Sequence, residues 1–372
     1  MCDKFEGSLL PTEAPDMLNY LRWEAFGVCA LITAWNSPLG VLICKLAPAL
    51  AAGNAVVIKP SEHASVSTLE LMSVLQEADL PVGLLNGVTG YGESTGELLV
   101  DHPDVRMVSF TGGLSGGRAA AEVAARQVKP VVMELGGKSP QIILQDADMD
   151  LAVNGVVSGI FPATGQSCIS GSRILVHQSQ IQDFTERLVD VASRARVGDP
   201  LDSSTQVGPI ANRPHYDKVL RDIENALVAG AELLLDGRGK GPEQGYYVGP
   251  TIFSGVTNDT LIAQEEVFGP VVVVIPYADE DEAVRMANDT VYGLAAGIWT
   301  QDVNKAIRMA DRIQTGTVYI NNYFNAATQS PVGGFKQSGY GREAGFEGMR
   351  CFMQTKSVWL ATNPTQPDAF PL

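Results

Sequence analysis

A single thiol in a run of small and polar residues is the first candidate for chemistry in this sequence. Cys168 lies in GQSCISGSR, between an apolar segment and an arginine. A thiolate is a strong nucleophile where a neighbouring group takes its proton or stabilises its charge. A lone cysteine is more often an inert buried residue, so both interpretations stay open until its neighbours are considered.

Two further polar residues stand at positions where an apolar element ends. Glu134 closes the predicted strand VVMEL directly before two glycines, where a carboxylate is unfavourable unless it faces a cleft. Asn36, in AWNSP, lies where a predicted strand meets a predicted helix. Its amide either donates a hydrogen bond to an oxyanion or caps the helix. Taken singly, each of these residues is more often structural.

A glycine-rich loop indicates a site for a phosphorylated ligand. VRMVSFTGGLSGGRAAAEVAAR predicts a strand, a loop containing Gly112, Gly113, Gly116 and Gly117, and a helix whose N-terminus favours an anion. The spacing is not GxGxxG, so the loop alone is equally consistent with a plain tight turn.

The segment AVVIKPSE adds to the indication of a nucleotide site. Lys59 falls at the carboxyl end of a predicted strand, the edge at which open α/β sheets bind nucleotides, and Glu62 follows at the predicted start of the next helix. A carboxylate there accepts a ribose hydroxyl and repels a 2′-phosphate, which favours NAD over NADP. The alternative is that Lys59 is simply solvated and that Glu62 only favours the start of the helix.

These residues must be positioned by alternating strands and helices. The runs GVCALITAW, NAVVIKP, VRMVSFTG and PVVMELGG predict buried strands, and PLGVLICKLAPALAAG and SVSTLELMSVLQEAD predict helices between the first three. This alternation is typical of parallel β-α-β units with helices on both faces of the sheet. A second α/β series begins near residue 137. We therefore expect two α/β lobes, with a cleft near their junction at ELGGKSP.

Composition excludes several other classes of function. The formal charge of −16 disfavours nucleic acid as a partner. The longest apolar stretch is interrupted by Lys45, Pro48 and Gly53, so we expect no membrane segment. The five cysteines are scattered without metal-ligand spacing, so we expect no metal site and a cytoplasmic protein.

Eight motifs in a fixed order carry a family resemblance. They are AWNSP, ALAAGNAVVIKPSE, FTGG, MELGGKSP, GQSCISGSR, EEVFGPV, GTVYIN and PVGGFKQSGYGRE. Over about residues 18–361 the chain resembles the hydrolytic, NAD(P)-dependent branch of the aldehyde dehydrogenase superfamily. The resemblance implies an α/β fold: a Rossmann-like parallel-sheet cofactor domain, an α/β catalytic domain and a small β-hairpin oligomerisation element. It also implies an aldehyde substrate, NAD or NADP as cofactor, and a homodimer or homotetramer.

The resemblance assigns a role to each candidate. Cys168 is the nucleophile, Glu134 the general base that hydrolyses the thioester, and Asn36 an oxyanion donor together with the Cys168 N–H. Lys45 and Glu343 match residues of a proton-exit route. The cofactor positions implied are Trp35, Lys59, Glu62, Gly112, Gly113, Gly117, Leu135, Glu266 and Phe268. Family members usually have serine where this chain has Gly113, so we expect one hydroxyl contact to pyrophosphate to be missing.

The expected substrate pocket is unusually open. Its residues by resemblance are Ser37, Ser167, Ile169, Tyr323, Phe324, Ala326 and Val332. Ser37, Ala326 and Val332 occupy positions that are often phenylalanine in relatives acting on small aldehydes. Loss of these rings leaves room in a close-packed interior. We therefore expect bulky, aromatic or polar aldehydes as substrates, with Tyr323 and Phe324 as apolar walls.

The implied domain division follows the motifs along the chain. It places a hairpin segment at 1–25, the NAD-binding domain at 26–136, the catalytic domain at 137–336, a helical segment at 337–351, and a C-terminal strand and tail at 352–372. Members usually carry roughly another quarter of chain before AWNSP. The sequence is then a fragment, a short form completed by oligomer contacts, or a fold with little activity, and we expect exposed apolar surface on the first lobe.

Three alternatives to a hydrolytic dehydrogenase stay open. One is a non-catalytic NAD-binding member of the family, and another is a CoA-acylating enzyme. Glu134 argues against the latter, because that branch usually lacks this base. A thiol hydrolase is the third alternative. It normally pairs cysteine with histidine, and His63, His102, His177 and His215 lie in none of the motifs.

Overall fold

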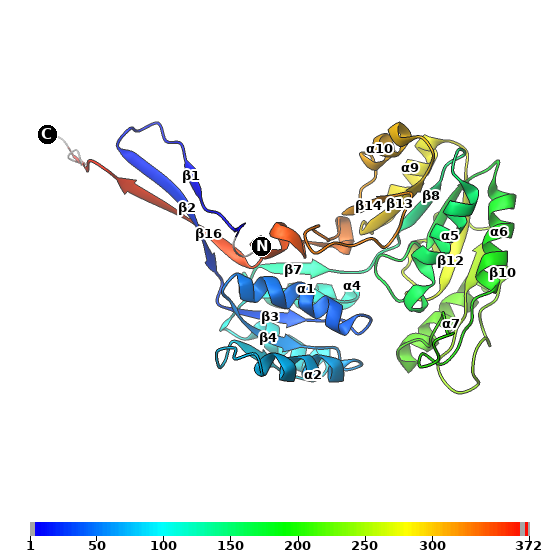
Figure 1. Cartoon of the computed structure of the whole chain (residues 1–372), viewed down its shortest axis with the longest axis horizontal. Coiled ribbons are helices and arrows are strands. Elements are labelled where there is room, and N and C mark those ends of the chain that lie inside the picture. The colour runs from blue at the N-terminus through cyan, green and yellow to red at the C-terminus, as the bar shows by residue number, and fades with distance from the viewer. Residues whose placement is uncertain (1–3, 365–368, 371–372) are drawn as a thin grey trace.

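Two α/β lobes and a projecting three-stranded sheet make up the protein, in a computed structural model that describes residues 4–364 and 369–370 (Figure 1). Residues 1–3 of the expected hairpin segment, and 365–368 and 371–372 of the expected tail, lie outside the described residues. The α/β fold class expected from the sequence is confirmed by the mostly parallel sheets of the two lobes.

The first lobe contains a six-stranded sheet with the strand order β15-β7-β6-β3-β4-β5. All neighbours are parallel except β15 and β7. Its strands are β3 (Val28–Ile32), β4 (Ala55–Lys59), β5 (Leu85–Gly87), β6 (Val105–Thr111), β7 (Val131–Glu134) and β15 (Gly339–Tyr340). The helical segments are α1 (Pro38–Ala51), α2 (Ser65–Gln76), η2 (Gly92–Gly96), α3 (Glu97–Asp101) and α4 (Leu114–Arg126).

Helices cover both faces of this sheet because its strands are apolar on both sides. Leu42 and Leu46 of α1 and Met72 of α2 pack on one face with Cys29 and Ile58. On the opposite face, residues of α3 and α4 pack against β3 and β6. The carboxyl ends of β3, β4, β6 and β7 therefore form one edge, and the candidate residues Asn36, Lys59, Gly112 and Glu134 lie at or just beyond it.

The second lobe contains a seven-stranded sheet with the order β10-β11-β12-β9-β8-β13-β14. Only β10 is antiparallel to its neighbour. Its strands are β8 (Pro140–Ile143), β9 (Arg173–His177), β10 (Glu232–Leu235), β11 (Thr251–Ser254), β12 (Val271–Tyr277), β13 (Ala295–Trp299) and β14 (Thr317–Ile320).

Its helices again form two layers around the sheet. α5 (Met149–Ile160) and α6 (Ile181–Ser193) pack on one face. The other face carries α7 (Arg213–Val228), α8 (Leu261–Gln264), α9 (Glu280–Asn288) and α10 (Val303–Ala310). Two 3-10 turns, η3 (Pro162–Gly165) and η4 (Lys336–Ser338), precede the Cys168 loop and β15.

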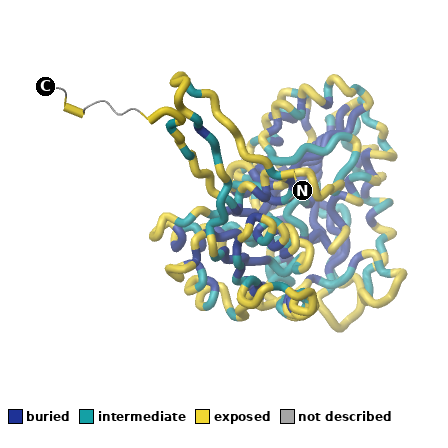
Figure 2. The backbone as a smooth tube through the Cα atoms, turned by 60° about the vertical axis from the view of Figure 1, so that its left-hand side comes forward, coloured by how far each residue is buried: buried dark blue, intermediate teal, exposed yellow. Residues whose placement is uncertain are grey.

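The third sheet joins the two ends of the chain. The strands β1 (Ser8–Leu10) and β16 (Met353–Ala361) both pair antiparallel with β2 (Met17–Ala25). Figure 2 shows this sheet extending away from the lobes with mostly exposed or half-buried backbone. Leu9, Trp359 and Leu360 are 68%, 63% and 51% exposed.

The segment after residue 336 returns to the first lobe. Gly339 and Tyr340 form β15 opposite Glu134 and Met133, and α11 (Gly345–Arg350) follows it and packs beside α1. The sequence predicts only a helical segment here, because a two-residue strand shows no periodicity. Apolar side chains are exposed along α1 and α2, among them Leu39, Ile43, Val66, Leu69 and Val74. Within the described part of the chain, no helix is both long and apolar enough to cross a membrane.

Candidate functional site

The loop between α5 and β9 in the second lobe carries Cys168, and its backbone is strained just before that residue. Ala163, Thr164 and Gly165 all have left-handed backbone conformations, with φ of 51°, 58° and 68°. Only glycine fits at the last of these positions, because a Cβ there would lie 2.2 Å from the carbonyl oxygen of Gly269. Such conformations persist where the surrounding structure holds them. The loop is therefore fixed against the segment that follows Phe268.

Cys168 itself is half-buried beside the turn that follows β7. A Cβ on Gly137 would lie 2.5 Å from the Cys168 carbonyl oxygen, so the loop and the turn are in direct contact. Burial raises the pKa of the Cys168 thiol to about 12, and the nearby carboxylates of Glu266 and Glu134 contribute in the same direction. The thiol is protonated at neutral pH, so attack on a substrate requires that its proton be removed.

Asn36 contacts the Cys168 loop and does not cap α1. The N-cap of α1 is Ser37, and the helix has no side-chain capping hydrogen bond. Asn36 Nδ2 instead donates to the carbonyl oxygen of Gln166 at 3.0 Å, two residues before Cys168. A side-chain amide nitrogen has two hydrogens, so one donor is left beyond this bond. The capping alternative is thereby excluded.

Glu134 is a buried carboxylate next to a buried ion pair. Burial and the charge of Glu343 raise its pKa well above the usual range, while Lys45 and Arg342 act in the opposite direction. Glu134 Oε1 is buried and has no hydrogen-bond partner in the described structure. The Lys45 ammonium pairs with Glu343 Oε1 and donates to Ser109 Oγ at 2.9 Å. Such an unpartnered oxygen can accept a proton from a thiol or a water.

Glu266 is fixed to the same glycine turn. Its Oε1 accepts a hydrogen bond from the Gly137 N–H at 2.9 Å, and a Cβ on Gly136 would lie 2.2 Å from its Oε2. Burial raises the pKa of Glu266 to about 7, against the opposing effects of the Gly137 N–H, Lys138 and Lys218. Lys138 is buried beside it, and burial and Arg173 lower the pKa of Lys138 to about 7.

Trp35 and Phe268 meet across the space between the lobes. Their ring centroids are 5.4 Å apart in an edge-on arrangement. His215, at the start of α7, lies 5.1 Å from the Trp35 ring and 5.7 Å from the Phe268 ring. His215 is not among the residues expected from the sequence, although it contacts two of them. Its segment matches no quoted motif, and no periodicity places the first turn of α7 against Phe268.

A cavity of about 470 Å³ lies at the carboxyl edge of the first sheet, beside α4. Lys59, Phe110, Ser115, Gly116 and Val123 are among its lining residues. Its size and position suit the adenosine half of a dinucleotide, and the α4 N-terminus adjoins it.

The residues around this cavity are closely packed at some positions and open at others. Lys59 pairs with Glu62 at 3.6 Å, and Glu62 lies in the turn before α2, which begins only at Ser65. A Cβ on Gly117 would lie 2.5 Å from Leu135. One on Gly112 would lie 2.8 Å from Phe110. Gly113 is the N-cap of α4, and a Cβ added to it would meet no other atom within 4 Å.

Part of the expected substrate pocket gathers near Cys168. The Tyr323 hydroxyl donates to the Ile169 carbonyl oxygen at 2.8 Å, and the Tyr323 ring meets the Phe324 ring edge-on, with the ring centroids 5.5 Å apart. Ser167 lines a small cavity that Gly137 and Glu266 also line. Val332 pairs through both backbone groups with Glu343 at 2.8 Å. Ser37 and Ala326 are exposed.

Comparison with known proteins gives consistent results. The model of the aldehyde dehydrogenase family matches residues 1–358. A betaine aldehyde dehydrogenase of Brucella anthropi is 45% identical over 344 residues, which cover 92% of this chain and 70% of that protein. Human retinal dehydrogenase 2 is 42% identical over 357 residues, covering 96% and 68%. A solved betaine aldehyde dehydrogenase from Staphylococcus aureus, in complex with NAD+, superposes with a TM-score of 0.96 at 37% identity, covering 100% of this chain and 74% of that one.

Proposed function

Because the chain belongs to the aldehyde dehydrogenase family, we propose that it oxidises an aldehyde to a carboxylic acid with NAD as the oxidant. The observation that carries this proposal is the arrangement at Cys168: a thiol, a buried carboxyl oxygen of Glu134 without a partner, and the amide of Asn36 bonded to the same loop. The solved relative in complex with NAD+ supports the choice of cofactor.

The first step is attack of the Cys168 sulfur on the aldehyde carbonyl carbon. The thiol proton goes to Glu134, whose raised pKa makes it a competent acceptor near neutral pH. The carbonyl oxygen becomes an oxyanion, for which the free Asn36 amide hydrogen and the Cys168 N–H are the proposed donors. NAD, when bound, accepts the hydride that leaves the substrate carbon.

A thioester between Cys168 and the acyl group remains after oxidation. Once Glu134 has passed on the thiol proton, it takes a proton from a water molecule, which attacks the acyl carbon. The carbon–sulfur bond then breaks, the acid is released, and the Cys168 thiolate takes up the proton from Glu134. One aldehyde, one NAD+ and one water give one carboxylic acid, one NADH and one proton. The buried pair of Lys45 and Glu343 lies next to Glu134 and is the proposed exit for that proton.

The cofactor specificity proposed is for NAD. Glu62 is ion-paired with Lys59, which lines the cavity beside α4, so its carboxylate offsets the one ammonium there that could attract a 2′-phosphate. A 2′-phosphate there would meet like charge. Binding of NAD and NADP, compared by titration of protein fluorescence, tests this assignment.

The proposed substrates are bulky, aromatic or polar aldehydes. Ser37 and Ala326 leave two pocket positions without rings, while Tyr323 and Phe324 provide apolar surface beside Ile169. The relatives named for betaine aldehyde and retinal handle a polar and a bulky aldehyde, by their names. Acetaldehyde as the substrate with the highest kcat/KM would contradict this proposal.

Production of NADH tests the proposed reaction directly. The protein is incubated with NAD and a panel of aldehydes of graded bulk, with and without CoA. Cys168→Ala should abolish NADH formation, whereas Cys44→Ser, which removes an exposed thiol, should not. NAD binding without NADH formation would instead indicate a non-catalytic member of the family. A requirement for CoA would indicate an acylating enzyme.

We also propose that the protein assembles as a homodimer or homotetramer in a reducing compartment. The three-stranded sheet exposes Leu9, Trp359 and Leu360, and exposed apolar surface of this kind marks a site of contact with another protein chain. Cys29, Cys44, Cys168 and Cys351 are all free. Relatives named as cytosolic are in keeping with such a compartment.

A further inference from the structure

Side chains of α7 hold the backbone of residues 266–268, the segment that carries two proposed cofactor residues. His215 Nε2 contacts the Phe268 carbonyl oxygen at 2.6 Å. Because that oxygen can only accept, Nε2 carries the hydrogen. Lys218 Nζ donates to the carbonyl oxygens of Glu266 at 2.8 Å and Val267 at 3.4 Å. Three consecutive carbonyl groups thus bond to one face of one helix.

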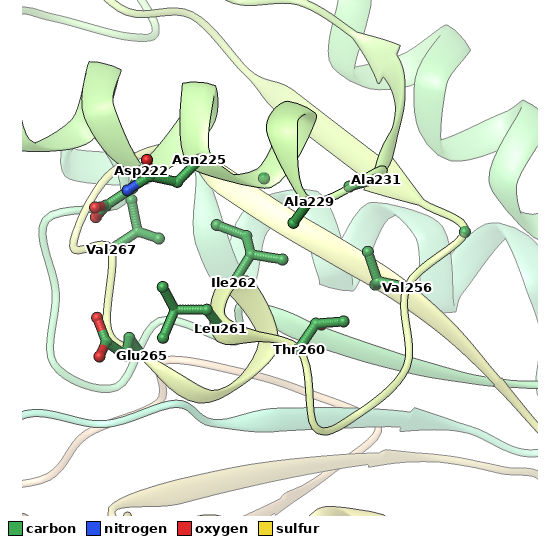
Figure 3. A pocket seen from close by; sticks show the side chains of 12 residues that line it. Asp222, Asn225, Ala229, Ala231, Val256, Thr260, Leu261, Ile262, Glu265 and Val267 are labelled. Atoms are coloured by element: carbon green, nitrogen blue, oxygen red, sulfur yellow. The ribbon is translucent and has the colours of Figure 1, made fainter.

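The spacing of these residues on α7 explains how the helix does this. His215 and Lys218 are three residues apart, and Asp222 follows after another four, so all three lie on one helical face. Asp222 Oδ2 accepts a hydrogen bond from Lys218 Nζ at 2.7 Å, which orients the ammonium. Figure 3 shows Asp222 on α7 next to Val267, at one end of a small pocket that Glu265 also lines. The contact between α7 and this segment is therefore continuous.

Residues 266–268 need the hydrogen bonds from α7, because their backbone is strained. Phe268 has a φ of 61°, in the left-handed region that is unfavourable for a residue with a side chain. At one end of the segment, the Glu266 carboxylate bonds to the Gly137 N–H. At the other end, Gly269 lies against Gly165 of the Cys168 loop. A displacement of the segment would move its contacts with both the glycine turn and the nucleophile loop.

We infer that His215 and Lys218 are positioning residues, which set the cofactor-facing geometry of Glu266 and Phe268 by bonding to their backbone carbonyl groups. This rests on the proposed function, because it takes those two residues as ligands of the nicotinamide half of NAD. His215 has a second effect, because its ring packs against the rings of both Trp35 and Phe268 and joins them to α7.

The experiment compares His215→Ala, His215→Gln and Lys218→Met with the unaltered protein. The affinity for NAD is measured by fluorescence titration, independently of turnover. We expect His215→Ala and Lys218→Met to weaken NAD binding by about tenfold each, the size of one net hydrogen bond. His215→Gln retains a side-chain N–H donor and should recover most of that loss.

Steady-state kinetics separate positioning from general damage to the fold. KM for NAD should rise in the alanine and methionine variants while KM for the aldehyde changes less than about twofold. Arg213→Gln is the matched control: it breaks an exposed ion pair with Asp217 on the same helix and should leave NAD affinity unchanged. Melting temperatures without NAD identify any variant that is not folded.

The outcomes distinguish this inference from the proposed function. Unchanged NAD affinity in folded His215→Ala and Lys218→Met would overturn the positioning role and leave the enzymatic proposal intact. Equal losses in the alanine and glutamine variants would also overturn the role assigned to the His215 bond. Failure of the unaltered protein to bind NAD would refute both. Loss of binding in the variants of a protein that forms no NADH would support the positioning role and refute the reaction.

Discussion

Replacing one member of the buried pair of Lys45 and Glu343 should destabilise the protein. It should also displace the pH profile of kcat, in a direction that depends on which charge is lost. The Lys45 side chain is fully buried and that of Glu343 is 10% exposed, so neither charge can be hydrated if its partner is removed. Removing one partner of a buried pair costs about 3–5 kcal/mol. At the average unfolding entropy per residue, a chain of 372 residues loses about 1–1.5 °C per kcal/mol, so Tm falls by roughly 3–8 °C.

The two single variants should also differ in how much stability each of them loses. Lys45→Met leaves Glu343 and Glu134 together without the ammonium, so we expect its stability loss at the upper end of that range. Glu343→Gln leaves Lys45 next to Glu134, which can replace the lost partner, so its loss should be smaller. The double variant that combines Lys45→Met with Glu343→Leu removes both charges and should be more stable than Lys45→Met alone.

The same charges act on the proposed base. Lys45 lowers the pKa of Glu134 and Glu343 raises it. Glu134 works as a base only when ionised, so the acid limb of the kcat–pH profile should move to higher pH in Lys45→Met and to lower pH in Glu343→Gln. Thermal unfolding without NAD and kcat measured across pH provide the two readouts.

Two exposed ion pairs that share Arg187 provide the control for this experiment. Arg187→Gln breaks its pairs with Asp183 and Asp150, and these three side chains are 46%, 56% and 83% exposed. Its stability should change by less than about 1 kcal/mol and its acid limb should stay in place. Displacement of the acid limb in the same direction by Lys45→Met and Glu343→Gln would refute the reasoning. So would a loss below about 1 kcal/mol in Lys45→Met.

Three further changes test other parts of the structure. Gly113→Ser places a hydroxyl in open space at an uncapped helix start, so it should stabilise the fold by a few tenths of a kcal/mol and tighten NAD binding; an unaltered Kd in fluorescence titration would show that the hydroxyl is dispensable. Without NAD, alkylation of Cys168 by iodoacetamide should accelerate as pH rises toward about 12, and a plateau below the ordinary thiol pKa of about 8.5 would contradict the burial argument. Because this pKa is raised on folding, the stabilising effect of the neutral thiol is full below about 8.5 and is lost as pH rises through about 12. Trp359→Lys combined with Leu360→Lys should lower the mass measured by sedimentation if β16 lies in an interface, whereas the exposed Val228→Lys on α7 should leave it unchanged.

The strands that carry candidate residues were predictable because each is a short apolar run ended by turn residues. β3, β4, β6 and β7 all fall within the four runs named from the sequence. Their parallel pairing brings their carboxyl ends to one edge, which is why Lys59 and Glu134 could be nominated from the sequence alone. The roles of Cys168 and Asn36 came from the family resemblance, since either residue alone is more often structural.

Contacts made by side chains far apart in sequence could not be predicted in the same way. His215 and Lys218 are ordinary residues of an amphipathic helix, and only the fold shows that they face the carbonyl groups of residues 266–268. β15 consists of two residues placed by pairing with β7, and no periodic pattern is possible over that length. The sequence left Asn36 either as an oxyanion donor or as a helix cap, and its bond to Gln166 depends on the position of a loop from the other lobe.

Two late strands, β15 and β16, pair with strands that come much earlier in the chain, and this affects the order in which the parts can fold during synthesis. The strands of the second lobe all come from residues 140–320, so that lobe can assemble while the ribosome is still adding residues. The first lobe receives β15, and β2 pairs along its whole length with β16, which ends at Ala361. β2 must therefore wait for β16, which is made much later, and termination within β16 would leave one edge of β2 unpaired and open to wrong pairing.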